Sequence, residues 1–398
     1  MMIFERFLRN SKKDEVVAIL DIGSGSVGGT LVSYPINKKP KILHSVRVPI
    51  SFYDNFNFER FLKATLFATE KVLQALNSES VETDKPKQIF YILATPWCVS
   101  QSRTAVFEDL NTFFTTHKKV DQIITNEVKS LKIKTNALYK NFTSNNMETI
   151  EIENIKTKLN GYETNAPYGK KISKLEADLY ISMSTCEILQ SFRQITKRIF
   201  EMNQIFFNSF SLAAFIVMRD LYSEKQNFIF VDMGGEATEI FITHNGILTD
   251  TFSISLGKNF LLRTMTSEMQ TTKEETLSLF GLFMEGNLTA TKKQKVQKAL
   301  EYVAAEWNEA FCKEIQSRSE CRILPRLFFV AADTPFAQWL TTTIKNNKLK
   351  DILKQPIEVA LINPLIFNKF VAVDIKTKSD IFMTVGTLFV DRLIKSKS

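Results

Sequence analysis

The sequence predicts an α/β protein of two lobes, with a small α+β insert in the first lobe. The main observation is a pattern that occurs twice: an apolar strand, an aspartate, one apolar residue, a glycine turn and a second strand. It spans residues 16–33 around Asp21 and residues 227–243 around Asp232. Because the copies lie in different halves of the chain, we expect two related lobes with a ligand between them. The second observation is the long segment between the copies, which predicts the insert.

The two glycine turns are typical of loops that bind phosphate. Glycine lets the backbone turn sharply and approach a ligand closely, and exposed backbone N–H groups can then hold phosphate oxygens. An aspartate at the end of each strand suits a hydrated Mg²⁺, which neutralises phosphate charge. The chain has only 13 glycines, so the clusters at 23–29 and 234–235 are informative.

The composition is that of an ordinary globular protein. The 398 residues suffice for two or more domains and a sizeable core. The net charge of +8 favours an anionic membrane surface or a nucleic acid. The charged residues are spread along the chain, and no RNA-binding signature or recognition-helix motif occurs. We therefore expect a solvated surface and no nucleic-acid partner, with a membrane surface as the alternative.

Cysteine usage predicts a cytoplasmic protein. Cys98, Cys186, Cys312 and Cys321 lie far apart, and no pair has the spacing of a zinc site. A chain of this size does not need disulfides, which fits a reducing compartment. No run of residues is long and apolar enough to span a membrane, and the N-terminus lacks the apolar core of a signal peptide.

The first 13 residues are apolar and basic, and two interpretations stand open. In one, the segment lies on a membrane surface, with Phe4, Phe7 and Leu8 as its contacts. In the other, it is a frayed leader or a helix that docks on the first lobe. The first interpretation predicts a protein at the inner face of the cell membrane.

The first glycine turn is followed by strands. Residues 15–20 form a continuous apolar run, as expected for a buried strand. Residues 23–28 match the dinucleotide-binding pattern G-x-G-x-x-G, which requires a helix to begin at the turn. Instead, a short strand, a turn at Pro35 and a second strand at 41–49 follow. A β-hairpin in this position argues against a dinucleotide-binding domain.

Residues 52–180 predict the α+β insert. Apolar residues at helical spacing cover 58–77. A second helix is expected at 123–131, with Thr125 as its cap. No catalytic constellation occurs in this segment. Strands are expected at 88–94, 100–107, 148–156 and 174–184.

The rest of the chain completes the two lobes, and Asn245-Gly246 predicts a tight hairpin turn. Helices are expected at 185–202, 211–221, 272–282, 291–317, 335–344 and 379–394, and strands at 205–208, 247–255, 326–332 and 357–361. We assign 13–51, 181–224 and 378–398 to the first lobe, 52–180 to the insert, 225–258 and 322–377 to the second lobe, and 259–321 to a helical subdomain of the second lobe.

Together these parts resemble the actin-like ATPase superfamily, which has a two-lobed, ribonuclease H-like fold. Asp21-Ile-Gly-Ser-Gly-Ser is similar to its first phosphate loop, and Asp232-Met-Gly-Gly-Glu-Ala-Thr-Glu to its second. The insert resembles that of the FtsA and PilM branch, the actin homologues of bacterial cell division and type IV pili. Residues 160–171 and 175–181 resemble the end of the insert in FtsA. Ser211-Leu-Ala-Ala and Val385-Gly-Thr-Leu are similar to two helices of the superfamily.

The resemblance implies a site for ATP and Mg²⁺ between the lobes. Asp21 and Asp232 would hold Mg²⁺, mainly through water. Glu274, Ala331 and Ala332 would lie on the nucleoside side. The residues that would contact phosphate are Gly23, Ser24, Gly25, Ser26, Gly234, Gly235 and Thr238.

Three departures from the family pattern weaken the prediction of catalysis. The adenosine loop of the family is rich in glycine, whereas residues 330–335 read Val-Ala-Ala-Asp-Thr-Pro, whose Cβ atoms would crowd a purine. Leu277 stands where a lysine is expected after Glu274. Phe210 stands where an acidic residue often positions the attacking water. We expect ATP binding with slow or absent hydrolysis; weak binding of the nucleotide, or a scaffold that holds no nucleotide, stays open as the alternative.

Three functions follow from the resemblance. The first is an FtsA-like scaffold that is peripheral to the membrane, self-associates and links an FtsZ-like filament to the membrane in cell division. The second is a PilM-like platform of type IV pilus assembly, which captures a peptide of a bitopic pilus protein in a groove beside the insert. The third is a small-molecule kinase on the same fold, although no substrate-binding insertion with a catalytic aspartate is evident.

Overall fold

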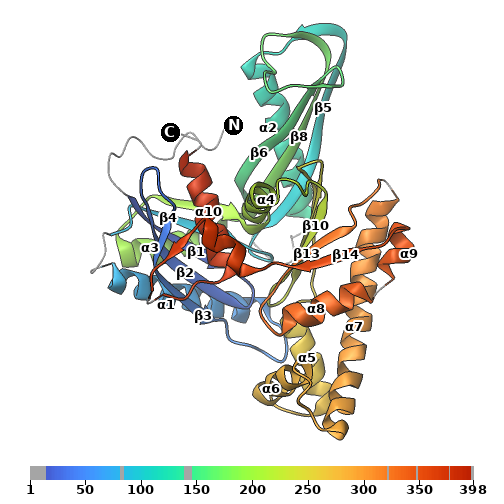
Figure 1. Ribbon diagram of the computed structural model, residues 1–398. Helices are drawn as coiled ribbons and strands as arrows, with labels where there is room; N and C mark the ends of the chain where they lie inside the picture. The colour runs from blue at the N-terminus through green and yellow to red at the C-terminus, as the bar shows by residue number, and fades with distance from the viewer. Residues whose placement is uncertain are drawn as a thin grey trace.

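The computed structural model describes residues 15–80, 85–138, 146–320, 322–346, 348–375 and 377–395. Phe4, Phe7 and Leu8, the expected membrane contacts, lie outside the described residues. The chain forms two α/β lobes side by side, with a sheet-and-helix insert that projects from them (Figure 1). Across the described ranges, no helix is both long and apolar enough to cross a membrane.

The first lobe is built on a six-stranded sheet. Its first three strands form an antiparallel meander, as the sequence predicted, and the next two join it in parallel. No helix begins at the first glycine turn, because the chain continues directly into the second strand. In spatial order the strands are β15 (Ala372–Val373), β3 (Lys41–Pro49), β2 (Ser26–Tyr34), β1 (Glu15–Ile22), β4 (Gln88–Leu93) and β9 (Ile205–Ser209).

Helices cover both faces of this sheet, which explains the continuous apolar run of β1. Val16, Ala18 and Leu20 pack toward α1 (Phe58–Glu79) and α3 (Cys186–Phe200). Val17 and Ile19 pack on the opposite face, in a core shared with α4 (Phe210–Leu221) and α10 (Ile381–Lys395). Successive side chains of a strand point to opposite faces, so a strand buried on both sides needs apolar residues throughout.

The second lobe repeats the arrangement around Asp232. The strand that carries this aspartate is antiparallel to the next strand and parallel to a later one, as in the first lobe. Asn245 and Gly246 both have positive φ, of 52° and 70°, which confirms the predicted hairpin turn. In spatial order the strands are β12 (Ile247–Ile254), β11 (Thr238–His244), β10 (Phe228–Met233), β13 (Leu327–Ala331) and β14 (Glu358–Leu361).

The remaining helices follow the second glycine turn, and α5 to α9 share one core with the strands of the second lobe. The long helix α7 buries Trp307 and Phe311 against the second-lobe core. In Figure 1 helices α5 and α6 lie at the end of the molecule opposite the insert. The elements are α5 (Lys258–Met269), α6 (Lys273–Met284), α7 (Ala290–Ser319), α8 (Phe336–Lys345), α9 (Leu349–Leu353) and the 3₁₀ helix η2 (Pro364–Lys369).

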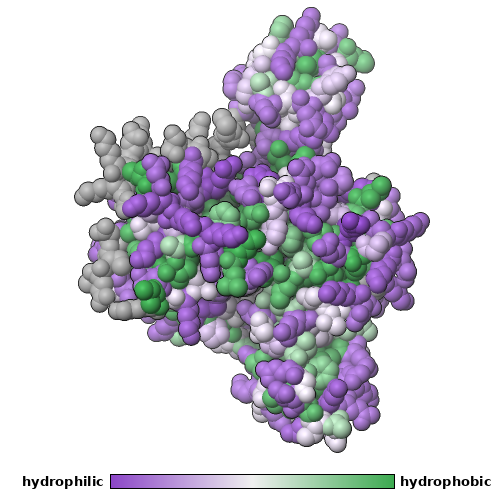
Figure 2. All heavy atoms as spheres, viewed as in Figure 1, coloured by the Kyte–Doolittle hydropathy of each residue, from purple (hydrophilic) through white to green (hydrophobic). Residues whose placement is uncertain are grey.

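The insert is a four-stranded antiparallel sheet with one helix, α2 (His117–Leu138), on one face. Figure 2 shows mainly hydrophilic atoms on the insert, while hydrophobic atoms gather in the middle of the face, over the two lobes. Its strands in spatial order are β5 (Val99–Phe114), β8 (Lys171–Thr185), β6 (Met147–Leu159) and β7 (Tyr162–Glu163).

Two expectations for the insert differ from the structure. The predicted insert, 52–180, includes α1 and β4, but β4 pairs with β1 and α1 packs on the first-lobe sheet, so the separate sheet begins at Val99. The helix predicted at 123–131 begins at His117, which places Thr125 inside it rather than at its cap. Val120, in the first turn, is buried in the core of the insert, and this tertiary contact extends the helix.

Candidate functional site

The two predicted phosphate loops meet in space. Backbone N–H of Glu236 donates to the Ser24 hydroxyl at 2.9 Å. A Cβ atom on Gly235 would overlap the carbonyl oxygen of Ser24 and the amide of Gly25, so only glycine allows this approach. One small cavity lies between the loops. Of the predicted residues, it is lined by Asp21, Gly23, Ser24, Gly25, Ser26, Asp232, Gly234 and Gly235.

Four other predicted residues do not line this cavity. Thr238 is fully buried; its hydroxyl donates to the Leu256 carbonyl at 2.7 Å and accepts from the Trp307 indole at 3.3 Å. Ala331 ends strand β13 in the core that the two lobes share, whereas Ala332 packs against the separate core of the second lobe. Glu274 is exposed in the first turn of α6. Thr238 therefore anchors α7 to the second sheet in this conformation.

Arg47 on β3 forms an ion pair with Asp21, the first aspartate of the duplicated pattern. The sequence analysis did not predict a role for Arg47. Its guanidinium donates to the Asp21 carboxylate at 2.8 Å, to the Asp380 carboxylate at 2.6 Å and to the Ser26 hydroxyl at 2.9 Å. Burial alone would lower the pKa of Arg47, but the two carboxylates raise it above its ordinary value. The guanidinium thus supplies, from within the chain, the positive charge that Mg²⁺ would bring to Asp21.

The sequence signal that could have indicated the role of Arg47 is Gly28, but it can be recognised only once the register of the hairpin is known. Gly28 on β2 lies directly opposite Arg47 on β3. A Cβ atom on Gly28 would come within 2.6 Å of a guanidinium nitrogen. The glycine therefore leaves the space through which the side chain of Arg47 reaches the loop.

Asp232, the second aspartate, is buried and forms no ion pair with a described cation. One of its carboxylate oxygens has no hydrogen-bond partner among the described residues. Burial raises the pKa of Asp232 well above its ordinary value, and the negative charges of Glu239, Asp21 and Asp333 add to the shift. The nearby Lys258 forms its ion pair with Asp333. The positive charge of Lys258 opposes the shift, but burial outweighs it.

The residues around this cavity match a phosphate site in kind, but the space does not fit ATP with Mg²⁺. The cavity has a volume of only about 40 Å³, which is enough for one or two water molecules. Phe210 and Phe382 close one side, with ring centroids 5.7 Å apart. A triphosphate would require the two glycine loops to separate.

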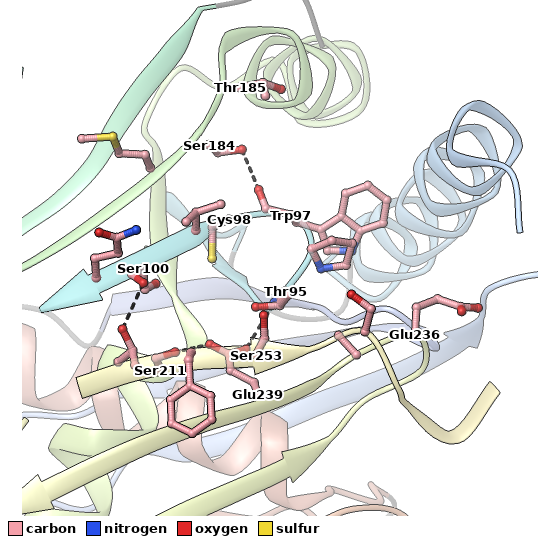
Figure 3. Close-up of a pocket in the computed structure, with 18 of the residues that line it drawn as sticks. Thr95, Trp97, Cys98, Ser100, Ser184, Thr185, Ser211, Glu236, Glu239 and Ser253 are labelled. Atoms are coloured by element: carbon pink, nitrogen blue, oxygen red, sulfur yellow. Dashed lines mark hydrogen bonds between the residues drawn. The ribbon is translucent and has the colours of Figure 1, made fainter. Parts of the chain in front are cut away.

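A much larger pocket lies next to this cavity, where the insert meets both lobes. Its volume is about 880 Å³. Thr95, Ala237 and Glu239 line both this pocket and the small cavity, so only one layer of side chains separates the two. Figure 3 shows Thr95 and Ser211 directed toward Glu239 in this layer. The carboxylate accepts from the Thr95 amide at 3.2 Å and from the Ser211 hydroxyl.

Trp97 connects the large pocket to the first phosphate loop. Its indole N–H donates to the Gly23 carbonyl at 2.9 Å, and its own carbonyl accepts from the Ser184 hydroxyl at 2.6 Å. Ser184 lies near the end of a strand of the insert, and Figure 3 shows its hydrogen bond to Trp97. With the bond from Trp97 to Gly23, the insert, the pocket wall and the loop are joined by two consecutive hydrogen bonds. A ligand that moves Trp97 would therefore act on both the insert and the first phosphate loop.

The pocket combines apolar side chains with charged groups at its rim. Two acids of the second lobe are already paired: Glu236 with Arg263 at 2.6 Å, and Asp250 with Arg318 at 2.8 Å. Arg103 differs, because its guanidinium bonds only to the Gln101 side chain within the described part of the chain. The apolar lining comprises Phe56, Phe58, Pro96, Trp97, Val99, Met147, Met183, Ile188 and Phe252.

Comparison with known proteins gives similarity in structure only. No protein-family model matches the chain, and no curated protein matches it. A chain of a structure described as "PilM-PilN type IV pilus biogenesis complex" has a TM-score of 0.60 at 12% identity, over 96% of this chain and 98% of that one.

Two further solved structures are less similar. A Bacteroides thetaiotaomicron protein "with actin-like ATPase fold and unknown function" has a TM-score of 0.41 at 10% identity, over 96% and 99% of the two chains. The ethanolamine utilization protein EutJ from Carboxydothermus hydrogenoformans has a TM-score of 0.43 at 13% identity, over 97% and 93%. The duplicated strand–turn–strand units and the whole-length match agree: this chain has the two-lobed actin-like ATPase fold, in the form seen in the PilM–PilN complex.

Proposed function

We propose that this chain is a PilM-like scaffold at the inner face of the cell membrane, which binds a segment of a membrane protein and does not depend on ATP turnover. The observation that carries this proposal is the contrast between two cavities. The pocket at the insert has about 880 Å³, whereas the cavity between the phosphate loops has about 40 Å³. The whole-length likeness to the PilM–PilN complex supports the same choice.

The lining of the large pocket suits an extended peptide with apolar residues and one acid. Phe56, which is 51% exposed, offers apolar contact in this pocket, and apolar contacts of this kind anchor peptides in grooves. Arg103 offers a guanidinium with free N–H donors, which favour a bidentate carboxylate. We therefore expect the partner segment to place an aspartate or glutamate beside Arg103.

A two-hybrid screen of this chain against the cytosolic segments of bitopic membrane proteins from the same genome tests the proposal. The captured segment is then measured with purified protein. Gln101→Trp would fill the pocket, and Arg103→Glu would repel the acid. Both should weaken binding by about tenfold or more, since the added bulk and the reversed charge each disrupt contacts worth about 1–3 kcal/mol.

Val106→Trp is the matched control, because Val106 lies on the same strand, is 53% exposed and does not line the pocket. This variant should bind as the unaltered chain does. Equal binding by all three variants would place the partner elsewhere and refute the pocket.

An FtsA-like division scaffold is the alternative, and the resemblance of residues 160–171 and 175–181 to FtsA favours it. It predicts capture of an FtsZ-like filament protein and self-association of this chain. The same screen with the filament protein as prey separates the two functions. Light scattering of the purified chain over a range of concentrations tests self-association.

ATP and Mg²⁺ enter this proposal only as ligands of an opened cleft. The paired Arg47 and the contact between the glycine loops both favour the closed form. Phe210 lines the cleft where an acid would position water, which leaves hydrolysis without support. A small-molecule kinase is disfavoured for the same reason, because it needs bound ATP in every cycle.

A further inference from the structure

A second surface of the first lobe combines lysines with exposed apolar side chains. A hollow of about 500 Å³ lies between the β2–β3 turn, the end of η2 and α10. We call it the basic hollow, because its lining includes Lys38, Lys39, Lys369 and Lys395. The only acid among its described lining residues is Asp391. Asp391 is already paired with Lys395 at 2.6 Å. Across the described residues, no carboxylate pairs with the other three lysines.

The apolar part of this surface is contributed by the same segments. Ile36, in the turn, is 58% exposed, and Phe370, directly after η2, is 43% exposed. Both are adjacent in sequence to the lysine segments of the hollow. Exposed apolar side chains beside flexible cations are typical of proteins that lie on an anionic bilayer, because the apolar groups enter the headgroup region while the ammonium groups stay at the phosphates.

The segments that form the hollow are held in place by the fold. The Tyr34 hydroxyl, at the end of β2, donates to the Thr387 carbonyl of α10 at 3.0 Å. The Ala372 amide donates to the Pro40 carbonyl at 2.9 Å, which fixes the segment after η2 to the turn. Figure 1 shows α10 beside the strands of the first-lobe sheet. The lysines therefore project from a rigid base rather than from independent loops.

We propose that the basic hollow and its apolar rim, Ile36 and Phe370, bind the surface of an anionic lipid bilayer. A free phosphate fits less well, because the hollow is wide and its four lysines are all exposed, with no buried polar group among them to orient an anion. A bilayer matches both parts of the surface, since it presents many negative headgroups over an apolar interior. This surface is distinct from the large pocket and does not depend on the function proposed for it.

Vesicle co-sedimentation of the full chain tests the proposal. We expect binding to vesicles of phosphatidylcholine mixed with phosphatidylglycerol, weakening as salt is raised, and little binding to phosphatidylcholine alone. The triple variant Lys38→Glu, Lys39→Glu, Lys369→Glu should bind more weakly by a factor of about ten or more. The double variant Ile36→Ser, Phe370→Ser should weaken binding at high salt, where charge is screened.

A matched control carries the same change of charge at the far end of the molecule. Lys292→Glu, Lys293→Glu, Lys298→Glu alters three exposed lysines of α7, and this variant should bind as the unaltered chain does. Equal losses in both triple variants would mean attraction by net charge alone and overturn the proposal. So would loss of binding on deletion of residues 1–10 with the first triple variant unaffected, or full displacement by inorganic phosphate at constant ionic strength.

Discussion

At the scale of single residues, Arg47 decides the state of the cleft. It bridges Asp21 of β1 and Asp380 before α10, and it also bonds to Ser26 of the first glycine turn. Three groups that a metal or a phosphate would need are thus engaged by one side chain. Asp232 has no such ion pair among the described residues, and burial raises its pKa well above its ordinary value.

Replacement of Arg47 by alanine should destabilise the chain by about 2–3 kcal/mol, because it leaves two carboxylates without their cation. This is below the cost of breaking a fully buried pair, since Asp380 is partly exposed. Urea unfolding measures the loss. Arg47→Lys keeps the charge but not the three-way bonding, and it should recover only part of the stability. Full recovery by lysine would show that the hydrogen-bond geometry has no role.

Asp232→Asn should stabilise the protein at neutral pH. Burial raises the pKa of Asp232 in the folded state, so its contribution to stability is fully present below the unfolded pKa and is lost as pH rises through the folded pKa. Asparagine removes that loss, which we place at about 1–3 kcal/mol. Thermal unfolding from pH 4 to pH 8 should show the variant's advantage growing with pH. A constant difference would exclude ionisation as the cause.

At the scale of elements, the two strand–turn–strand units work as a pair because their turns touch. Gly235 lies against the backbone of Ser24 and Gly25, and Glu236 bonds to Ser24. Each turn is therefore part of the other's binding surface. The closed cleft is a property of this contact and not of either unit alone.

Gly235→Ala should destabilise the closed state, because the added Cβ meets backbone atoms that cannot move independently. Overpacking of this kind costs about 1–3 kcal/mol. Gly281→Ala in α6 is the control: nothing lies within 4 Å of its added Cβ, so alanine should stabilise the helix by about 0.5–1 kcal/mol. Melting temperatures of the two variants should move in opposite directions. A neutral Gly235→Ala would mean that the loops do not touch in solution.

At the scale of the whole molecule, the two lobes are joined through the insert as well as through the cleft. The Thr251 hydroxyl of the second lobe donates to the Ser100 carbonyl of the insert at 3.0 Å. Trp97 connects the base of the insert to the first glycine loop. A ligand in the large pocket thus contacts the same layer that closes the small cavity.

Millimolar ATP with Mg²⁺ should leave the melting temperature of the unaltered chain unchanged, because a ligand stabilises only a state that has room for it. Differential scanning fluorimetry checks this. The Gly235→Ala chain serves as a comparison in which the loops are forced apart. A nucleotide-dependent rise in the unaltered chain would show that the cleft opens readily, and would restore ATP as a ligand.

The sequence alone determined most of the fold, because its strongest signals are local. The apolar run of β1, the Asn245-Gly246 turn and the periodicity of α7 each fix an element through residues close in sequence. The predicted beginning of the insert, at residue 52, lies too early in the chain. The hydrophobic patterns of α1 and β4 are the same whether these elements join the first-lobe sheet or the sheet of the insert. Strand pairing decides that question, and pairing partners are distant in the chain.

The duplicated aspartate–glycine units by themselves determined the two-lobed actin-like fold and the place where the lobes meet. Only the tertiary structure decided what that place contains. Arg47 comes to Asp21 from another strand, and Phe382 comes to Phe210 from the last helix. Burial and contact of this kind depend on distances between segments far apart in sequence. They turn a pattern for phosphate binding into a closed cavity of about 40 Å³ beside a pocket of about 880 Å³.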